Sequence, residues 1–201
     1  MKDKAAPAGG DLNARIARRV RTRRAELGLT LAALAAQCAV SRSMLSLVER
    51  GESSPTAVVL EKIATGLGLP LAMLFDDVAA PADPVARRAG RTAWRDPQSG
   101  YVRRNLSPPG YSSPIRLVEV ELPAGARVAY ETGVREPGVH QQIWVLAGAI
   151  EVGVGAAVHR LAAGDCLAME LNVPTSFRNR TRKPARYLVA IAMAGARAGR
   201  P

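Results

Sequence analysis

The sequence predicts two domains of different class, an all-α head at the amino terminus and an all-β body at the carboxy terminus. Between residues 11 and 75, apolar residues recur at spacings of three and four, the period of a helix packed on one face. From about Tyr101 onward, short apolar runs alternate with Gly and Pro turns, as in a β-sandwich or barrel. The stretch in between contains Pro81, Pro84 and Pro97 and little periodicity, which predicts a linker with room for one strand.

Segment boundaries follow from these changes of pattern. We expect a disordered tail over residues 1–12, the helical head over 13–76, the linker over 77–100, the β domain over 101–195 and a second tail over 196–201. The length of 201 residues and the hydrophobic content of 48% are sufficient for two small packed cores. The sequence shows neither a signal peptide nor an apolar run of about 18 residues, so we expect a cytoplasmic protein with no membrane partner.

Charge and cysteine content narrow the function classes. The formal net charge is +11 and the pI is about 10.7, so an anionic partner is the first interpretation. Both halves of the chain are basic, however, and an Arg-rich composition alone would look the same. Aromatic content of 4% excludes the base-stacking platforms of many single-strand binders. Cys38 and Cys166 lie far apart in apolar surroundings, which predicts two buried thiols and no disulfide or Cys-x-x-Cys metal site.

The stretch from Thr30 to Gly51 predicts two short helices joined by a tight turn. Thr30 is a good N-cap for a helix over residues 31–38, and Ser41 is one for a helix that runs to about Arg50 and stops at Gly51. Ala39 and Val40 form the turn. The residues expected to pack inward are Leu31, Leu34 and Ala35 from the first helix, with Val40, Leu45 and Val48 from the turn and the second helix.

This packing leaves Arg42, Ser43, Ser46, Leu47 and Arg50 on the open face of the second helix. The face is short, polar and basic at its start, which is what a helix entering the DNA major groove requires. Arg42 can reach a guanine edge with two hydrogen bonds, and Ser43 and Ser46 can bond bases or phosphates. The alternative is an ordinary helical hairpin with a solvated face, which the match of the whole spacing disfavours.

Residues 13–76 resemble the helix-turn-helix domain of the lambda-repressor-like family, in the branch typified by the Xre repressor. The segments that carry the resemblance are RTRRAELGLTLAALA and VSRSMLSLVERGESSPTAVVLEKIATGLGLPLAMLF. The resemblance implies five helices, at about residues 14–27, 31–38, 42–50, 57–66 and 71–75.

The same resemblance implies roles for individual residues. Base contacts are expected from Arg42, Ser43, Ser46 and Leu47. Leu31 stands where many members carry a base-contacting Gln, so fewer direct base contacts are expected, with Leu47 reading a thymine methyl. Arg24 and Glu49 correspond to a buried pair that joins the first and third helices. Phosphate contacts are expected from Arg24, Thr30, Ser41, Arg50, Ser53 and Thr56, with Ser54 in the same loop.

A single head of this kind reads one half-site, so the expected partner is a palindromic double-stranded operator bound by a homodimer. The head contains no long heptad segment. We therefore expect the chain to dimerise through its β domain.

Residues from about Tyr101 to Met193 resemble a cupin, the small double-stranded jelly roll. The resemblance rests on EPGVHQQIWVLAGAIEVGVGAAVHRLAAGDCLAM and on NVPTSFRNRTRKPARYLVAI. Gly148 and Gly164 are expected at turns that need positive φ, and Asp165 is expected to form a turn.

Metal-binding cupins place two His and a Glu in the first motif and another His in the second. In this chain the two-His region falls on residues 135–137 without a His, the Glu position falls on Gln141, and the last His position falls on Thr175. His140 is alone and His159 lies in a separate hairpin. This departure predicts no metal ligand set, no cofactor and no catalytic residues.

The resemblance still implies a cavity at the barrel mouth for a small-molecule effector. The expected function is a transcription regulator, a repressor, that responds to a metabolite in a metal-free barrel. Two alternatives remain: a cupin metalloenzyme tethered to a helix-turn-helix head, and a barrel that serves only for dimerisation. Trp144 is expected in the core or a dimer interface. The candidate effector ligands are Tyr130, Glu136, His140, Gln141, Thr175 and Arg178.

Overall fold

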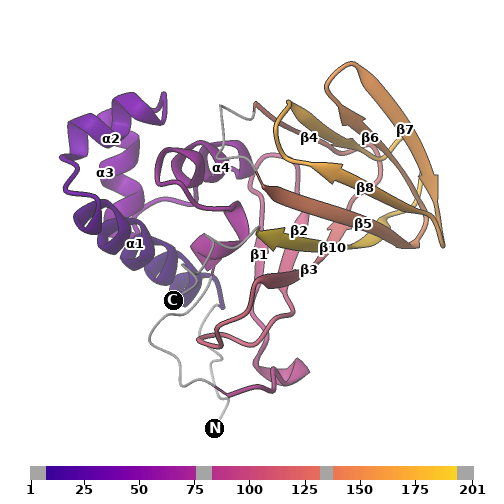
Figure 1. Cartoon of the computed structure of the whole chain (residues 1–201), viewed down its shortest axis with the longest axis horizontal. Coiled ribbons are helices and arrows are strands. Elements are labelled where there is room, and N and C mark those ends of the chain that lie inside the picture. The colour runs from indigo at the N-terminus through magenta and orange to yellow at the C-terminus, as the bar shows by residue number, and fades with distance from the viewer. Residues whose placement is uncertain (1–7, 76–82, 132–137, 194–201) are drawn as a thin grey trace, which may run out of the picture.

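The computed structural model describes residues 8–75, 83–131 and 138–193. In Figure 1 the helices gather at one end of the molecule and the strands form the body at the other. The head consists of α1 (Ala8–Glu26), α2 (Leu31–Gln37), α3 (Arg42–Arg50), α4 (Ala57–Gly66) and the 3-10 helix η1 (Leu71–Phe75).

Two predicted features of the head are corrected. The fifth helix over 71–75 is a 3-10 helix, because it starts after Pro70 and is only five residues long, so it closes on tighter hydrogen bonds such as Met73 N–H to the Pro70 carbonyl at 2.9 Å. The first helix begins at Ala8, inside the range expected as a tail. Once nucleated, a helix extends at the gain of one hydrogen bond per residue.

The caps and the turn of the predicted hairpin are confirmed. The Thr30 hydroxyl accepts from Ala33 N–H and the Ser41 hydroxyl from Met44 N–H, both at 3.1 Å. Gly51 ends α3 at φ +71°. The turn between α2 and α3 passes through Ala39 at φ +51°, the left-handed region that favours glycine.

Helices α2 and α4 approach closely at one point. A Cβ on Gly66 would lie 2.3 Å from Cys38 Sγ, so only glycine fits there. Burial raises the pKa of the Cys38 thiol to about 11, which keeps it a neutral, small apolar group. Within the described residues, no single helix is long and apolar enough to cross a membrane, and α2 and α3 reach that length only together, across a bend of 113°.

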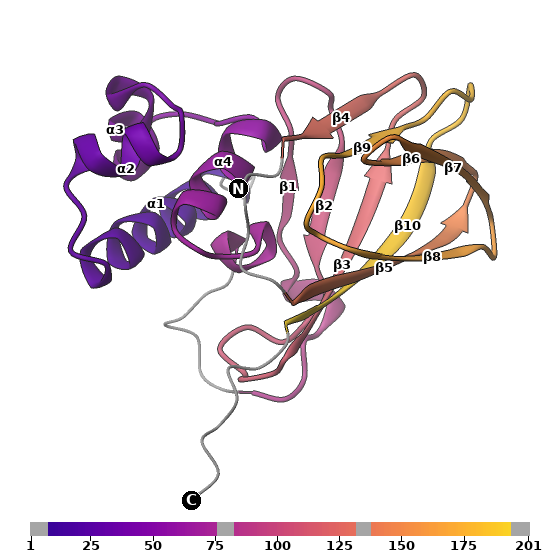
Figure 2. The ribbon, with the colours of Figure 1, turned by 45° about the horizontal axis from the view of Figure 1, so that its top comes forward.

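The body is a two-sheet sandwich (Figure 2). One sheet has the order β1-β2-β3-β10-β5-β8 and the other β4-β9-β6-β7, and the pairs are antiparallel. The strands are β1 (Ala93–Arg95), β2 (Val102–Asn105), β3 (Ile115–Leu122), β4 (Arg127–Tyr130), β5 (Val139–Ala147), β6 (Ala149–Val154), β7 (Ala157–Ala162), β8 (Cys166–Glu170), β9 (Thr175–Arg178) and β10 (Ala185–Met193).

The turn residues of the body are confirmed. Gly148 and Gly164 have φ of +78° and +97°. At Gly148 a Cβ would also lie 3.0 Å from the Ala185 Cα. The Asp165 carboxylate accepts from Ala162 N–H at 2.8 Å and so closes the turn before β8. Cys166, predicted to be buried, is exposed, because its strand places it on the outer face of the sheet.

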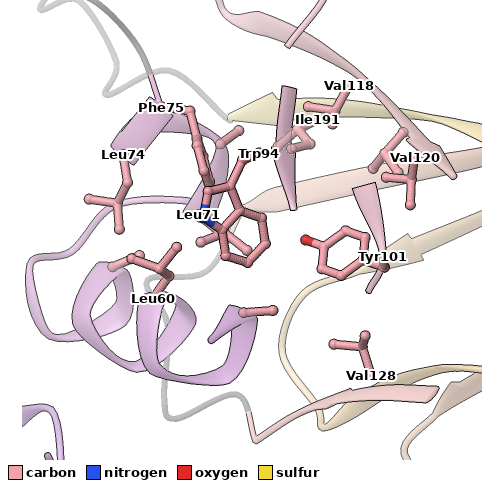
Figure 3. Close-up of a cluster of buried hydrophobic side chains, with 14 of the residues drawn as sticks. Leu60, Leu71, Leu74, Phe75, Trp94, Tyr101, Val118, Val120, Val128 and Ile191 are labelled. Carbon is pink, nitrogen blue, oxygen red and sulfur yellow. The ribbon is translucent and has the colours of Figure 1, made fainter. Parts of the chain in front are cut away.

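The range predicted as a linker contains a short 3-10 helix, η2 (Arg88–Gly90), and strand β1, and it joins the two domains tightly. Trp94 on β1 is only 4% exposed. Its ring packs edge-on against Phe75 of η1 at 5.6 Å and against Tyr101 at 5.7 Å (Figure 3). One continuous apolar cluster therefore runs from the helical head into the sandwich.

A buried polar contact reinforces this junction. Asp96, in the β1–β2 hairpin, accepts from Ala57 N–H at 2.9 Å and so binds the amino terminus of α4. Its second oxygen accepts from the Ser99 N–H at 2.8 Å. Trp94 and Asp96 thus make the first strand of the body part of a core that both domains share.

Candidate DNA-binding helix and effector cavities

Helix α3 presents the face that the sequence predicts for base contacts. Arg42 and Ser43 at its start are exposed, and Ser46 and Leu47 one turn later are half-buried. The opposite face of the helix is seated in the head by the buried residues Leu45, Val48 and Glu49. The polar start of α3 is therefore free to enter a groove while the rest of the helix is held.

Arg24 and Glu49 hold this helix against α1. Arg24 Nε lies 2.6 Å from Glu49 Oε1, and Nη2 lies 2.8 Å from Oε2. Both carboxylate oxygens therefore accept from one edge of the guanidinium. Arg24 Nη1 also donates to the Leu29 carbonyl at 2.9 Å. The hydrogen bonds to Glu49 raise the pKa of Arg24, and the implied buried pair is confirmed.

The residues predicted to contact phosphate differ in what they still offer. The hydroxyls of Thr30 and Ser41 accept backbone hydrogen bonds, and that of Ser41 also shares a hydrogen bond of 3.1 Å with the Ser43 hydroxyl. Arg50 lies 2.8 Å from Glu52 and also donates to Ser46, so part of its guanidinium is used within the head.

The loop before α4 is occupied by contacts from within the chain. Thr56 Oγ1 accepts from Val59 N–H at 3.3 Å, and the next backbone N–H, of Ala57, donates to Asp96. Ser54 accepts from Asn13 at 3.2 Å, while the Ser53 hydroxyl is buried without a hydrogen-bond partner. A phosphate at this helix terminus would meet the Asp96 carboxylate, a contact that no sequence pattern predicts.

Three of the six candidate effector residues share one cavity. Tyr130, Gln141 and Thr175 line a space of about 60 Å³ inside the sandwich. The head contributes to the same wall through Glu61 of α4 and Leu71 of η1.

His140 and Arg178 are not brought into this cavity. His140 alternates with Gln141 along β5 and is exposed on the outer face of the sheet, and Arg178 follows buried Phe177 and is exposed at the end of β9. Glu136 lies outside the described residues. The prediction that these residues line the same space as Tyr130 is therefore wrong for His140 and Arg178, since one step along a strand reverses the face.

The polar groups that line the cavity inside the sandwich include the hydroxyls of Tyr101, Tyr130 and Tyr187 and the guanidinium of Arg103. Tyr130 donates to the Tyr101 hydroxyl at 3.3 Å. Burial raises the pKa of Tyr130 and of Tyr187, while the positive charge of Arg103 opposes that rise. Both phenols are accordingly neutral near pH 7.

The donor set of the sandwich does not fit a transition metal. Gln141 and Thr175 face the same cavity, but an amide and a hydroxyl are weak ligands beside imidazole and carboxylate. Residues 135–137 of the first motif lie outside the described ranges. Across 8–75, 83–131 and 138–193, no three His, Cys, Asp or Glu side chains gather closely enough to hold a metal ion.

A larger cavity, of about 430 Å³, lies between the head and the six-stranded sheet. Its described walls include Leu12 and Arg15 from α1, Phe75 from η1, and Trp94 and Arg103 from the first two strands. None of these was a predicted site residue. The available signal was Arg103 itself, a charged residue in a strand at a position that faces the core opposite Val120.

Comparison with known proteins supports the assignment of both domains. Residues 20–74 match the helix-turn-helix family HTH_3 and residues 118–191 match the cupin domain family Cupin_2. The HTH-type transcriptional regulator SutR of Escherichia coli (strain K12) is 29% identical over 156 residues, which cover 78% of this chain and 82% of SutR.

Solved structures show similar arrangements. The crystal structure of an HTH_3 family transcriptional regulator from Vibrio cholerae superposes with a TM-score of 0.74 and 26% identity, covering 93% of this chain and 99% of that one. The hydroxypropylphosphonic acid epoxidase from S. wedmorenis covers 92% of this chain and 100% of its own, but at a TM-score of 0.45 and 19% identity. The chain is a helix-turn-helix regulator of the Xre-like type with a carboxy-terminal cupin domain.

Proposed function

We propose that this regulator is a cytoplasmic repressor that binds a palindromic operator as a homodimer. Binding of a small molecule changes its affinity for the operator. The single observation that carries the DNA-binding part is the exposed polar start of α3, held in place by the Arg24–Glu49 pair. A rigidly seated helix with exposed Arg and Ser side chains at its start can fix base contacts in the major groove.

The proposed dimer interface is the outer face of the six-stranded sheet. Leu188, Trp144 and Cys166 lie opposite one another on β10, β5 and β8. Trp144 is 48% exposed, which is unusual for so large an apolar side chain. Sedimentation of the wild type as a dimer, with Trp144→Lys shifted toward the monomer, would support this interface, and a dimer unchanged by Trp144→Lys would contradict it.

The proposed effector response follows from the position of the cavity, whose walls come from both domains. The space inside the sandwich is bounded partly by Glu61 and Leu71 of the head, so a molecule bound there would contact both domains. A ligand that prefers one placement of the head shifts the population toward it and changes the spacing of the two recognition helices.

Catalysis is not part of the proposed function. The positions of Gln141 and Thr175 offer no transition-metal ligand pair, and no carboxylate dyad accompanies them inside the sandwich among the described residues. Elemental analysis after chelator-free purification tests this point: one tightly bound transition metal per chain would favour the alternative of a tethered metalloenzyme.

DNA binding is tested with a gel shift on the DNA upstream of the protein's own gene. We expect saturable, salt-dependent binding by the wild type. Arg42→Ala should weaken specific binding by about 1–3 kcal/mol, because it removes a bidentate base contact. Arg180→Ala is the matched control, since it removes the same charge from an exposed site on the barrel. Equal affinities for wild type and Arg42→Ala would show that α3 does not read the operator.

A further inference from the structure

Arg103 is a buried cation without a counter-ion. Its residue is only 7% exposed, and its Nε and Nη2 are buried without a hydrogen-bond partner. The guanidinium contacts the Phe75 ring, whose centroid lies 5.3 Å from Cζ. A cation–π contact compensates only part of the hydration that a guanidinium loses on burial.

The described surroundings of the Arg103 guanidinium leave two of its nitrogens without a hydrogen-bond partner. Tyr130 and Tyr187 lie close enough for the charge of Arg103 to lower the pKa of each phenol, but burial raises both pKa values and keeps both phenols neutral. Glu61 lines the smaller cavity together with Arg103 and accepts a hydrogen bond from the Thr65 hydroxyl on its own helix. The buried Nε and Nη2 of Arg103 are therefore available to donate hydrogen bonds to an anion.

The larger cavity is suited to supply one. Arg103 stands in the walls of both cavities, and the larger one has a volume of about 430 Å³, within the range of small-molecule sites. Arg15, Arg87 and Arg91 also line the larger cavity, against a single described carboxylate, that of Asp83. These guanidinium groups can attract an anionic ligand to the cavity.

We propose that this junction pocket binds an anionic small molecule whose carboxylate, phosphate or sulfonate group accepts hydrogen bonds from Arg103. The inference rests on the proposed effector response and deepens it, by naming the chemical class of the effector and by placing it between the domains. Apolar surface from Leu12, Phe75 and Trp94 would contact the remainder of the molecule.

A ligand in this pocket would contact residues that hold the head against the body. Arg15 of α1 donates to the Phe75 carbonyl at 3.0 Å and to the Thr92 hydroxyl at 3.4 Å, so one side chain links α1, η1 and the approach to β1. Arg103 of β2 lines the same pocket. An anion held by Arg103 changes the balance of charge at the contact between the two domains, and with it the preferred placement of the head.

The test is a thermal-shift titration of the full chain with sodium phosphate and sodium succinate, each against sodium chloride at matched ionic strength. Wild type should show a saturable rise in Tm with at least one of the two anions. Arg103→Met should melt cooperatively but lose this rise, with affinity weakened roughly thirtyfold or more. The anion that binds more tightly identifies whether a phosphate or a carboxylate group is preferred.

Arg104→Met is the matched control. It is the same substitution on the same strand, but Arg104 lines neither cavity and lies near Glu121 at 3.9 Å, so its titration should match the wild type. Arg103→Lys keeps the charge and loses the planar fork, so it should bind more weakly than wild type but more tightly than Arg103→Met. A wild type that responds to neither anion, or an Arg103→Met that responds as the wild type does, overturns the proposal.

Gel shifts with the same proteins separate this proposal from the proposed function. In chloride, Arg103→Met should bind operator DNA, and phosphate or succinate should change the affinity of the wild type only. DNA binding by a wild type without any anion response would leave the regulator assignment standing and contradict the anion site. A saturable Tm response without DNA binding would do the reverse.

Discussion

Arg24 and Arg103 are both largely withdrawn from water, but their surroundings differ. Arg24 lies between α1 and α3 with two bonds to the Glu49 carboxylate and one to the Leu29 carbonyl. Arg103 lies between the head and the sheet against the Phe75 ring, and its Nε and Nη2 have no hydrogen-bond partner. The same side chain is thus a structural tie in one region and an unsatisfied binding group in the other, and the difference is set by its partners rather than by its burial.

Side-chain packing also differs between the head and the junction of the two domains. Inside the head, Cys38 and Gly66 approach so closely that one methyl group would not fit. At the junction a cavity of about 430 Å³ remains beside Trp94, although the aromatic residues around it are well packed. Close packing in the head keeps the recognition helix in a fixed position, while the cavity at the domain junction leaves space for a ligand.

The largest expected effect comes from breaking the junction. Trp94→Ala should lower the free energy of unfolding by about 3–5 kcal/mol, because it removes a buried aromatic that contacts both Phe75 and Tyr101. Urea denaturation measures the change. Trp144→Ala is the control, since that ring is 48% exposed and its loss should cost less than half as much in the isolated chain. Equal losses for the two variants would mean that Trp94 is not part of a shared core.

A smaller effect is expected inside the head. Gly66→Ala should destabilise the protein by about 1–3 kcal/mol, because its Cβ would overlap Cys38 Sγ. The double variant Cys38→Ala/Gly66→Ala should recover part of this loss. Gly90→Ala, where no atom lies within 4 Å of the added Cβ, should change stability by no more than about 0.5 kcal/mol. Additive losses in the double variant would exclude the proposed clash.

The smallest change in stability is expected at the turn between α2 and α3. Ala39→Gly should stabilise the head by up to about 1 kcal/mol, since it relieves a left-handed φ that costs an L-residue roughly that amount. The gain is small because glycine also has more entropy to lose on folding. A clear fall in Tm for this variant would show that the Cβ of Ala39 makes a contact worth more than the strain.

Much of the DNA-binding head could be predicted because its determinants are local. Thr30, Ser41 and Gly51 act within one turn of their own helices, and periodicity identifies the face that carries Arg42. The Arg24–Glu49 pair joins distant segments, and only the family resemblance implied it.

The junction could not be predicted because its partners are far apart in the sequence. The prolines around Trp94 are typical of a linker, and nothing in the sequence indicates that Asp96 reaches the amino terminus of α4 or that Arg103 lies against Phe75. The sandwich interior depends on strand register, which explains why Gln141 faces the cavity and His140 does not.

The comparison of the two arginines is tested most directly by urea denaturation of Arg24→Met and Arg103→Met side by side. Arg24→Met should lose about 3 kcal/mol or more, because it leaves the Glu49 carboxylate buried and unpaired. Arg103→Met should be as stable as the wild type or more stable in chloride, because it removes a cation that has no counter-ion. A loss in Arg103→Met as large as that in Arg24→Met would contradict the account, since it would mean that Arg103 is already neutralised within the chain.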